Sequence, residues 1–109
     1  MINARFYRDG ESLRMTIDGH AGYSRLGNDI VCAAVSGIFF ALMGYLRSFK
    51  RDMTKICAVE YGHADIICDP DCEEALKLAC MGIYEVALTY PDHVKVENGL
   101  WNWKMRRSA

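Results

Sequence analysis

The stretch DGHAGYSRLGNDIVCAAVSG, residues 18–37, marks the point where the sequence changes its hydrophobic period. Before it, apolar and polar residues alternate, which predicts a strand with one buried face. From Asp29 to about Lys50, apolar residues recur every three or four positions, which predicts a long helix. Asp29 is a typical N-cap residue, so we expect the helix to begin directly after it. The stretch therefore leads from a strand through a glycine-bearing loop into a helix.

Two strands are expected before this loop. Residues 2–9 and 12–18 both alternate, and Asp9-Gly10-Glu11 between them has the composition of a hairpin turn. The chain should therefore open with a β-hairpin that ends at Gly19 and His20.

A second hairpin follows the predicted helix. Residues 55–61 and 64–68 have strand composition, and Gly62-His63 suits a type II′ turn with glycine in the first central position. If this turn is tight, Cys57 and Cys68 become direct cross-strand neighbours.

The last third of the sequence predicts a helix and a strand. Asp69 should cap a helix with Pro70 in its first position, and Pro91 should end it. A short strand and an Asn98-Gly99 turn follow, and a further strand could carry Trp101 and Trp103 on one face. These two side chains would then either cover the core or form a dimer contact.

The resulting element order is β-β-α-β-β-α-β. Hairpins separated by helices predict an α+β fold with two layers, in which both helices pack on one face of a mixed β-sheet. The length of 109 residues and the lack of a linker-like segment favour a single domain over residues 1–109.

Charge and cysteine content exclude several classes of protein. The formal net charge of −1 offers no general attraction to nucleic acid or a membrane surface, so we expect neither as a partner. The apolar run at residues 30–46 is interrupted by Ser36, Gly37 and Gly44, which favours a core helix over a membrane span. No signal peptide is evident, and five cysteines is an odd number, so we expect reduced thiols and a cytoplasmic protein.

Cys32 and His20 are the candidate catalytic residues. Cys32 would be the third residue of the helix, where free N–H groups and the helix dipole favour a thiolate. His20 ends the preceding strand, and the loop is long enough to fold back so that the two side chains meet. The spacing permits this meeting without requiring it, and a structural role for each residue stays the commoner outcome for these residue types.

Four neighbours of this pair could support it. Gly22 and Gly27 could let the loop open and close over a peptide, and Ser36 lies one helical turn beyond Cys32. Asp29 could orient His20 as well as cap the helix, and backbone N–H groups around Cys32 could hold an oxyanion. The plainer interpretations are turn glycines, a surface serine and a simple cap.

No metal site or cofactor is expected. His63, Cys68, Cys72 and Cys80 have a spacing that does not suit zinc, and the sequence contains no C-x-x-C pair.

The same stretch resembles the signature of the ribosomal-processing cysteine protease family called Prp. The shared pattern is Gly19-His20-Ala21, a loop with Gly22 and Gly27, and Asp29 through Ser36. The resemblance includes the order of hairpins and helices and extends to about Val96. It leaves residues 97–109 as a C-terminal extension without a role assigned by resemblance.

This resemblance implies a cytosolic cysteine endopeptidase. Such enzymes remove a short N-terminal extension from protein twenty-seven of the large ribosomal subunit. Cys32 would be the nucleophile, His20 the general base and acid, and the loop between them a lid. The resemblance also implies a homodimer whose partner is the N-terminal peptide of the ribosomal protein.

A non-enzymatic ribosome-assembly or ribosome-binding module is the alternative. Such a module would have no need for a histidine at a strand end, glycines in the loop and a cysteine at a helix start. Their coincidence favours the protease.

Overall fold

The computed structural model describes residues 1–25 and 27–103. The strands are β1 (Ile2–Asp9), β2 (Ser12–Asp18), β3 (Thr54–Glu60), β4 (His63–Cys68) and β5 (Val94–Asn98), and the helices are α1 (Ile30–Phe49) and α2 (Glu73–Thr89). Two short 3-10 turns, η1 (Arg51–Met53) and η2 (Pro70–Cys72), connect them. The predicted order of strands and helices is confirmed.

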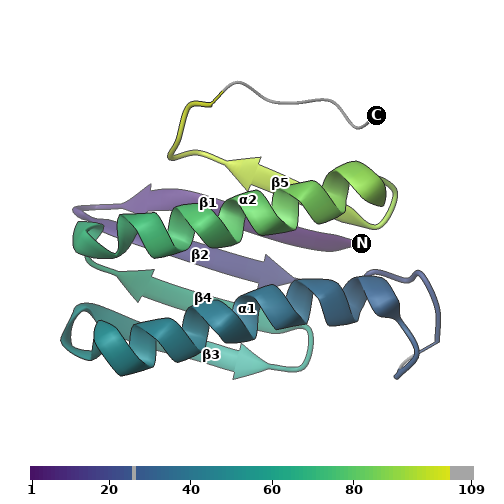
Figure 1. Ribbon diagram of the computed structural model, residues 1–109, viewed down its shortest axis with the longest axis horizontal. Helices are drawn as coiled ribbons and strands as arrows, with labels where there is room; N and C mark the ends of the chain where they lie inside the picture. Colours follow the sequence, from purple (N-terminus) through teal and green to yellow (C-terminus); the bar gives the residue numbers. More distant parts are fainter. Residues whose placement is uncertain (26, 104–109) are drawn as a thin grey trace.

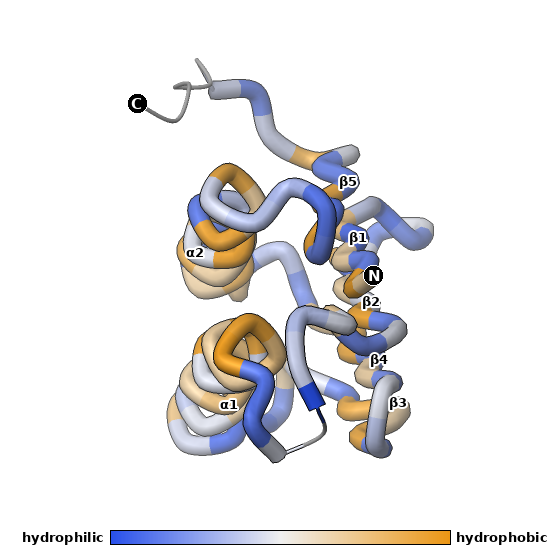
Figure 2. The backbone as a smooth tube through the Cα atoms, turned by 90° about the vertical axis from the view of Figure 1, so that its right-hand side faces the viewer, coloured by the Kyte–Doolittle hydropathy of each residue, from blue (hydrophilic) through white to orange (hydrophobic). Residues whose placement is uncertain are grey.

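The strands form one mixed sheet in the order β3-β4-β2-β1-β5. All neighbours are antiparallel except β1 and β5, which run parallel because the connection through α2 returns the chain to the same end. Both helices lie on one face of this sheet (Figure 1), and the edge view shows two layers (Figure 2). The predicted two-layer α+β fold is therefore confirmed.

Helix α1 begins where the sequence predicted. The carboxylate of Asp29 accepts hydrogen bonds from Val31 N and Cys32 N, which places Cys32 third in the helix. The helix is apolar and long enough for a membrane span by composition, with a mean hydropathy of 1.8. Its inward side chains pack against the sheet, as in a core helix: Val31, Val35, Phe39, Leu42 and Leu46.

The cap at Asp69 acts on a different element from the one expected. Its side chain accepts a hydrogen bond from Asp71 N at the start of η2, and Pro70 is the first residue of that turn. Helix α2 begins only at Glu73, because one turn of 3-10 helix precedes it.

The predicted turn of the second hairpin is wrong by one residue. Glu60 pairs with His63, so Tyr61 and Gly62 form the turn, and Gly62 has a φ of +78° at the second central position. A bulge between Ile56 and Ala58 shifts the register further along the hairpin.

Cys57 and Cys68 are consequently not cross-strand neighbours. Thr54 lies opposite Cys68, Cys57 is exposed, and all five cysteines are free thiols.

The chain after β5 folds back over the core without forming a further strand up to residue 103. The Asn98 side chain accepts hydrogen bonds from Leu100 N and Trp101 N, so the predicted turn is present. Trp101 packs on Phe6 with ring centroids 6.0 Å apart, and Trp103 contacts Tyr84. The two tryptophans therefore cover the core of their own chain.

Candidate active site

A cleft of about 800 Å³ opens between α1, the loop after β2 and the β3–β4 turn. Cys32 and Ser36 line it from α1, His20 from the strand end, and Tyr61 from the turn. Phe39 and Phe40 contribute apolar surface on the helix side. The fold thus brings the residues of the signature stretch and the second hairpin to one place.

The Cys32 thiol lies in the first turn of α1 and is half-buried. Its Sγ accepts a hydrogen bond from Ala21 N at 3.2 Å. A thiolate accepts such a bond more strongly than a thiol does, and the helix N-terminus also favours negative charge.

Asp29 joins the helix start to the loop. Its Oδ1 accepts from Val31 N and Cys32 N, and its Oδ2 accepts from Tyr23 N and Ser24 N at 3.0 and 3.3 Å. Burial raises the pKa of this carboxyl, but the four N–H donors outweigh burial and hold the pKa below its ordinary value.

Asp29 was expected to orient His20, and the N–H groups at the helix start were expected to hold an oxyanion. The hydrogen bonds of the structure point to other roles for both. All four hydrogen bonds to the Asp29 carboxylate come from backbone N–H groups, so within the described chain this residue shapes the loop and makes no hydrogen bond to the His20 ring. The N–H groups of Cys32 and Ala33 are already bonded to Asp29. They are therefore not free to hold an oxyanion, because in a capped helix start the first N–H groups already have hydrogen-bond acceptors.

His20 lies exposed at the mouth of the cleft. Its ring stacks on Tyr61 with centroids 4.4 Å apart, and its carbonyl oxygen accepts a hydrogen bond from Met1 N. Gly62 lies so near that a Cβ there would meet His20 Nε2 at 2.8 Å. In the part of the chain that the structure describes, no hydrogen bond joins this ring to Cys32 Sγ. The two side chains share the cleft.

The remaining predicted residues also border the cleft. Gly22 and Gly27 line it with positive φ angles of +66° and +85°, and Ser36 faces it from one turn beyond Cys32. Space is free around both glycines, so their backbone angle, and not crowding, favours glycine there. Their role as hinges stays a prediction.

Sequence analysis missed His93 and Tyr61. His93 Nδ1 lies 2.8 Å from Ala21 O, and Tyr23 sets its ring edge-on against both His93 and Tyr90. His93 is 72 residues beyond Ala21, and no sequence pattern links them. The strand pattern of residues 55–61 includes Tyr61, and only the turn seen in the structure brings its ring against His20.

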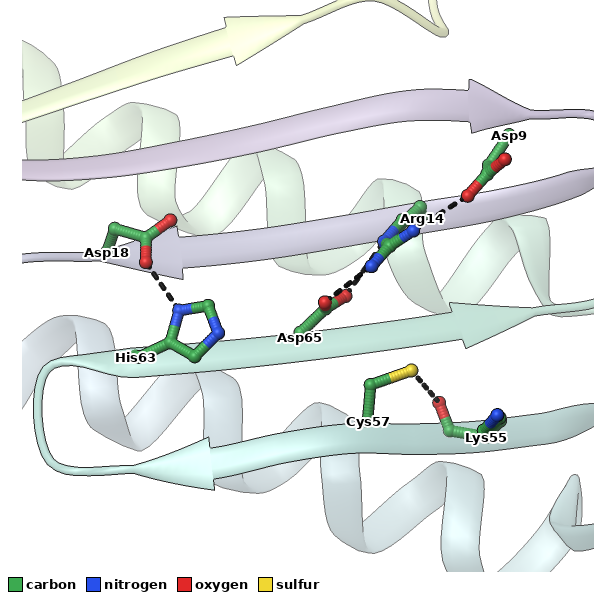
Figure 3. A network of polar contacts seen from close by, with 7 residues as sticks. All are labelled: Asp9, Arg14, Asp18, Lys55, Cys57, His63 and Asp65. Carbon is green, nitrogen blue, oxygen red and sulfur yellow. Dashed lines mark hydrogen bonds and ion pairs between the residues drawn. The ribbon is translucent and has the colours of Figure 1, made fainter.

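A charged network lies on the opposite face of the sheet (Figure 3). Arg14 pairs with Asp65 at 2.6 Å and with Asp9 at 2.8 Å. His63 pairs with Asp18 at 2.5 Å, and this hydrogen bond raises the pKa of the imidazole. Among the described residues, no three His, Cys, Asp or Glu side chains gather as a metal site.

A half-buried thiol at a helix start that shares a cleft with a histidine is an arrangement that a cysteine-dependent hydrolase requires. The sequence profile of the cysteine protease Prp family matches residues 1–95. The chain belongs to this family and is accordingly a cysteine protease.

Two relatives carry the name ribosomal processing cysteine protease Prp. The Mycoplasma genitalium protein is 30% identical over 79 residues, which cover 72% of this chain and 80% of the relative. The Mycoplasma pneumoniae protein is 28% identical over 87 residues, which cover 78% of this chain and 86% of the relative.

Solved structures share the fold. The Staphylococcus aureus ribosomal processing protease Prp, in complex with a covalently linked product peptide, matches with a TM-score of 0.78 at 20% identity. That match covers 90% of this chain and 99% of the other. A Streptococcus mutans protein matches with a TM-score of 0.65 at 27% identity, over 91% and 94% of the two chains.

Proposed function

We propose that this protease is a cytoplasmic endopeptidase that removes the N-terminal extension of protein twenty-seven of the large ribosomal subunit. Cys32 is the nucleophile and His20 the general base and acid. The observation that carries this assignment is the hydrogen bond from Ala21 N to Cys32 Sγ in a cleft that His20 also lines. The names of the Mycoplasma relatives support ribosomal processing as the task.

The chemistry follows from these positions. His20 takes the proton of the Cys32 thiol, and the thiolate attacks the scissile carbonyl, so that a tetrahedral intermediate forms with negative charge on the former carbonyl oxygen. The protonated His20 gives its proton to the leaving amine as the C–N bond breaks, and the thioester is left on Cys32. His20 then takes a proton from a water that attacks the thioester, the C–S bond breaks to release the N-terminal product, and the proton returns from His20 to the Cys32 thiolate.

The cleft suits an extended peptide. Its volume of about 800 Å³ is enough for several residues, and Val35, Phe39 and Phe40 offer apolar contacts on the helix side. Ala21 N is the donor that the structure places against the reacting sulfur.

The assignment is tested by cleavage of the full-length ribosomal protein by wild type, Cys32→Ala, His20→Ala and Cys57→Ala. Mass spectrometry identifies the new N-terminus. We expect both variants of the proposed pair to lose at least about a thousandfold in rate, and Cys57→Ala to keep the wild-type rate. Circular dichroism should show an intact fold in all four proteins. Full activity of Cys32→Ala would refute the assignment.

The same experiment separates the protease from a ribosome-binding module. If wild type binds ribosomal particles but leaves the ribosomal protein and its N-terminal peptide uncut, the binding module is the better description. We further propose that the chain forms a homodimer, and the outer face of α1 supports this as described below.

A further inference from the structure

We propose that His93 is a positioning residue for the Cys32 thiolate, acting through Ala21. The inference rests on the proposed role of Cys32 as the nucleophile. His93 lies in the connection between α2 and β5, outside the signature stretch. In the described chain its side chain makes its hydrogen bond to Ala21 O and none to Cys32 or His20.

The direction of the bond between His93 and Ala21 is settled by the acceptor. A backbone carbonyl oxygen only accepts, so His93 Nδ1 must carry a proton and donate it to Ala21 O at 2.8 Å. Ala21 is 2% exposed, so water does not easily replace this donor. The bond therefore holds the peptide that follows Ala21.

The peptide that precedes Ala21 is the one that meets the sulfur. Ala21 N donates to Cys32 Sγ at 3.2 Å, and the adjoining His20 carbonyl accepts from Met1 N. The loop beyond Ala21 is held separately, because Asp29 bonds to Tyr23 N and Ser24 N. Without His93, the Ala21 carbonyl would lose its partner and the N–H could turn away from Sγ.

His93 is itself held on both sides. Its backbone N–H donates to Tyr90 O, and its carbonyl accepts from Ile2 N of the sheet at 2.9 Å. The Tyr23 ring stands edge-on to the His93 ring with centroids 5.3 Å apart. The imidazole is thus anchored between α2, β1 and the loop, so it transmits a fixed position to Ala21.

The consequence for the reaction is specific. The bond from Ala21 N to Sγ is stronger with the thiolate than with the thiol, so losing it should slow attack by the sulfur more than it weakens peptide binding. We expect kcat to fall about tenfold with KM nearly unchanged, which is the size of one lost hydrogen bond.

Three substitutions of His93 separate the effect of its hydrogen bond from the effect of its aromatic ring. His93→Phe keeps an aromatic ring against Tyr23 and removes the N–H. His93→Asn keeps a donor near the Nδ1 position and removes the ring, and His93→Leu has the shape of asparagine without the donor. The readouts are kcat, KM and the alkylation rate of Cys32 by iodoacetamide at one neutral pH, measured in a Cys57→Ser background. Thermal unfolding is followed for each variant.

We expect His93→Phe and His93→Leu to slow both cleavage and the alkylation of Cys32 about tenfold. His93→Asn should keep most of the wild-type rate in both measurements. Wild-type rates in a folded His93→Phe variant would overturn the inference. So would an asparagine variant as slow as the leucine variant, and this comparison stands if His93→Phe does not fold. Failure of the proposed function looks different, since wild type would then leave the ribosomal protein uncut or Cys32→Ala would retain activity.

Discussion

Cys32 differs from the other four cysteines in burial and in surroundings. Cys68, Cys72 and Cys80 are buried, and burial raises the pKa of Cys68 and of Cys80 to about 12. Cys57 is exposed at the bulge of β3, where its Sγ lies 4.0 Å from Lys55 O. Only Cys32 combines access from the cleft with a helix start and an N–H donor at the sulfur.

Alkylation should therefore distinguish the thiols. In the native protein at neutral pH, we expect iodoacetamide to modify Cys32 first and Cys57 second, because thiolate content and access decide the rate. The three buried thiols should react only after unfolding. Peptide mapping by mass spectrometry over time measures the order. Cys57→Ser is the control that removes the exposed competitor, and equal rates at Cys32 and Cys57 would contradict an activated nucleophile.

At the scale of elements, the β3–β4 turn positions His20. The corrected register places Tyr61 and Gly62 in the turn, with Tyr61 stacked on the His20 ring and Gly62 next to Nε2. Gly19 N also donates to Gly62 O, which ties the end of β2 to this turn. A hairpin remote in sequence thus decides where the candidate base lies.

Gly62→Ala tests this contact. The added Cβ would lie 2.8 Å from His20 Nε2, so we expect His20 to be displaced and cleavage to fall by up to about a hundredfold. Gly10→Ala is the matched control, because Gly10 also has a positive φ, +62°, in a hairpin turn, and has no neighbour within 4 Å. Both variants should lose about 1 kcal/mol of unfolding free energy from backbone strain. An equal loss of activity in both would contradict the positioning of His20 by the turn.

At the scale of the whole molecule, the sheet has one charged face and one apolar face. Alternation in β2 sends Leu13 and Met15 toward the helices and Arg14 to the other side, where it meets Asp65 of β4. The Arg14 guanidinium holds the pKa of the Asp65 carboxyl below its ordinary value, although burial opposes this. The pair links β2 to β4 across the middle of the sheet.

The lowered pKa of Asp65 predicts the pH dependence of stability. The carboxyl of an unfolded chain has a pKa of about 3.9, so the pair stabilises the fold fully above that pH. This contribution is lost as the pH falls through the lower folded-state pKa. Arg14→Met should therefore reduce the unfolding free energy at neutral pH, and the difference from wild type should shrink in acid. Urea unfolding of both proteins at several pH values measures this difference in unfolding free energy.

Arg5→Met is the control for this experiment. Arg5 pairs with Glu97 at 3.0 Å, but both side chains are about half exposed, so that ion pair should contribute little. A loss in Arg14→Met that does not change with pH, or that merely equals the loss in Arg5→Met, would contradict the role given to Asp65.

The outer face of α1 is unusual for a surface helix. Residues 30–46 contain no charged side chain, and Tyr45, which is not among the residues that line the cleft, is 44% exposed. Surface helices ordinarily carry polar and charged residues on the side away from the core. Covering this face with a second copy of the chain would remove apolar surface from water, which supports the proposed homodimer.

Light scattering tests this dimer. We expect wild type to have twice the chain mass of 12.3 kDa, and Ala41→Arg on the outer face of α1 to approach the mass of one chain. Glu11→Arg in the exposed β1–β2 turn is the control and should remain dimeric. A monomeric wild type across the measured concentrations would exclude the homodimer.

Local patterns determined most of the fold and the two candidate catalytic residues. The alternation around β1 and β2, the cap at Asp29 and the position of Cys32 depend on neighbours within a few residues, so the sequence suffices for them. The bulge between Ile56 and Ala58 was missed because a bulge is a property of two paired strands, and neither strand shows it alone.

The tertiary structure alone decided what surrounds the reacting groups. His93 meets Ala21, Tyr61 meets His20, and Asp29 bonds to the loop instead of the histidine, all through contacts between segments that the sheet and helices bring together. Such contacts follow from the packing of whole elements, and no periodicity along the chain records them. The sequence by itself named the candidates for the chemistry, because their types and positions are local features, and the packing decided which side chains and backbone groups surround them.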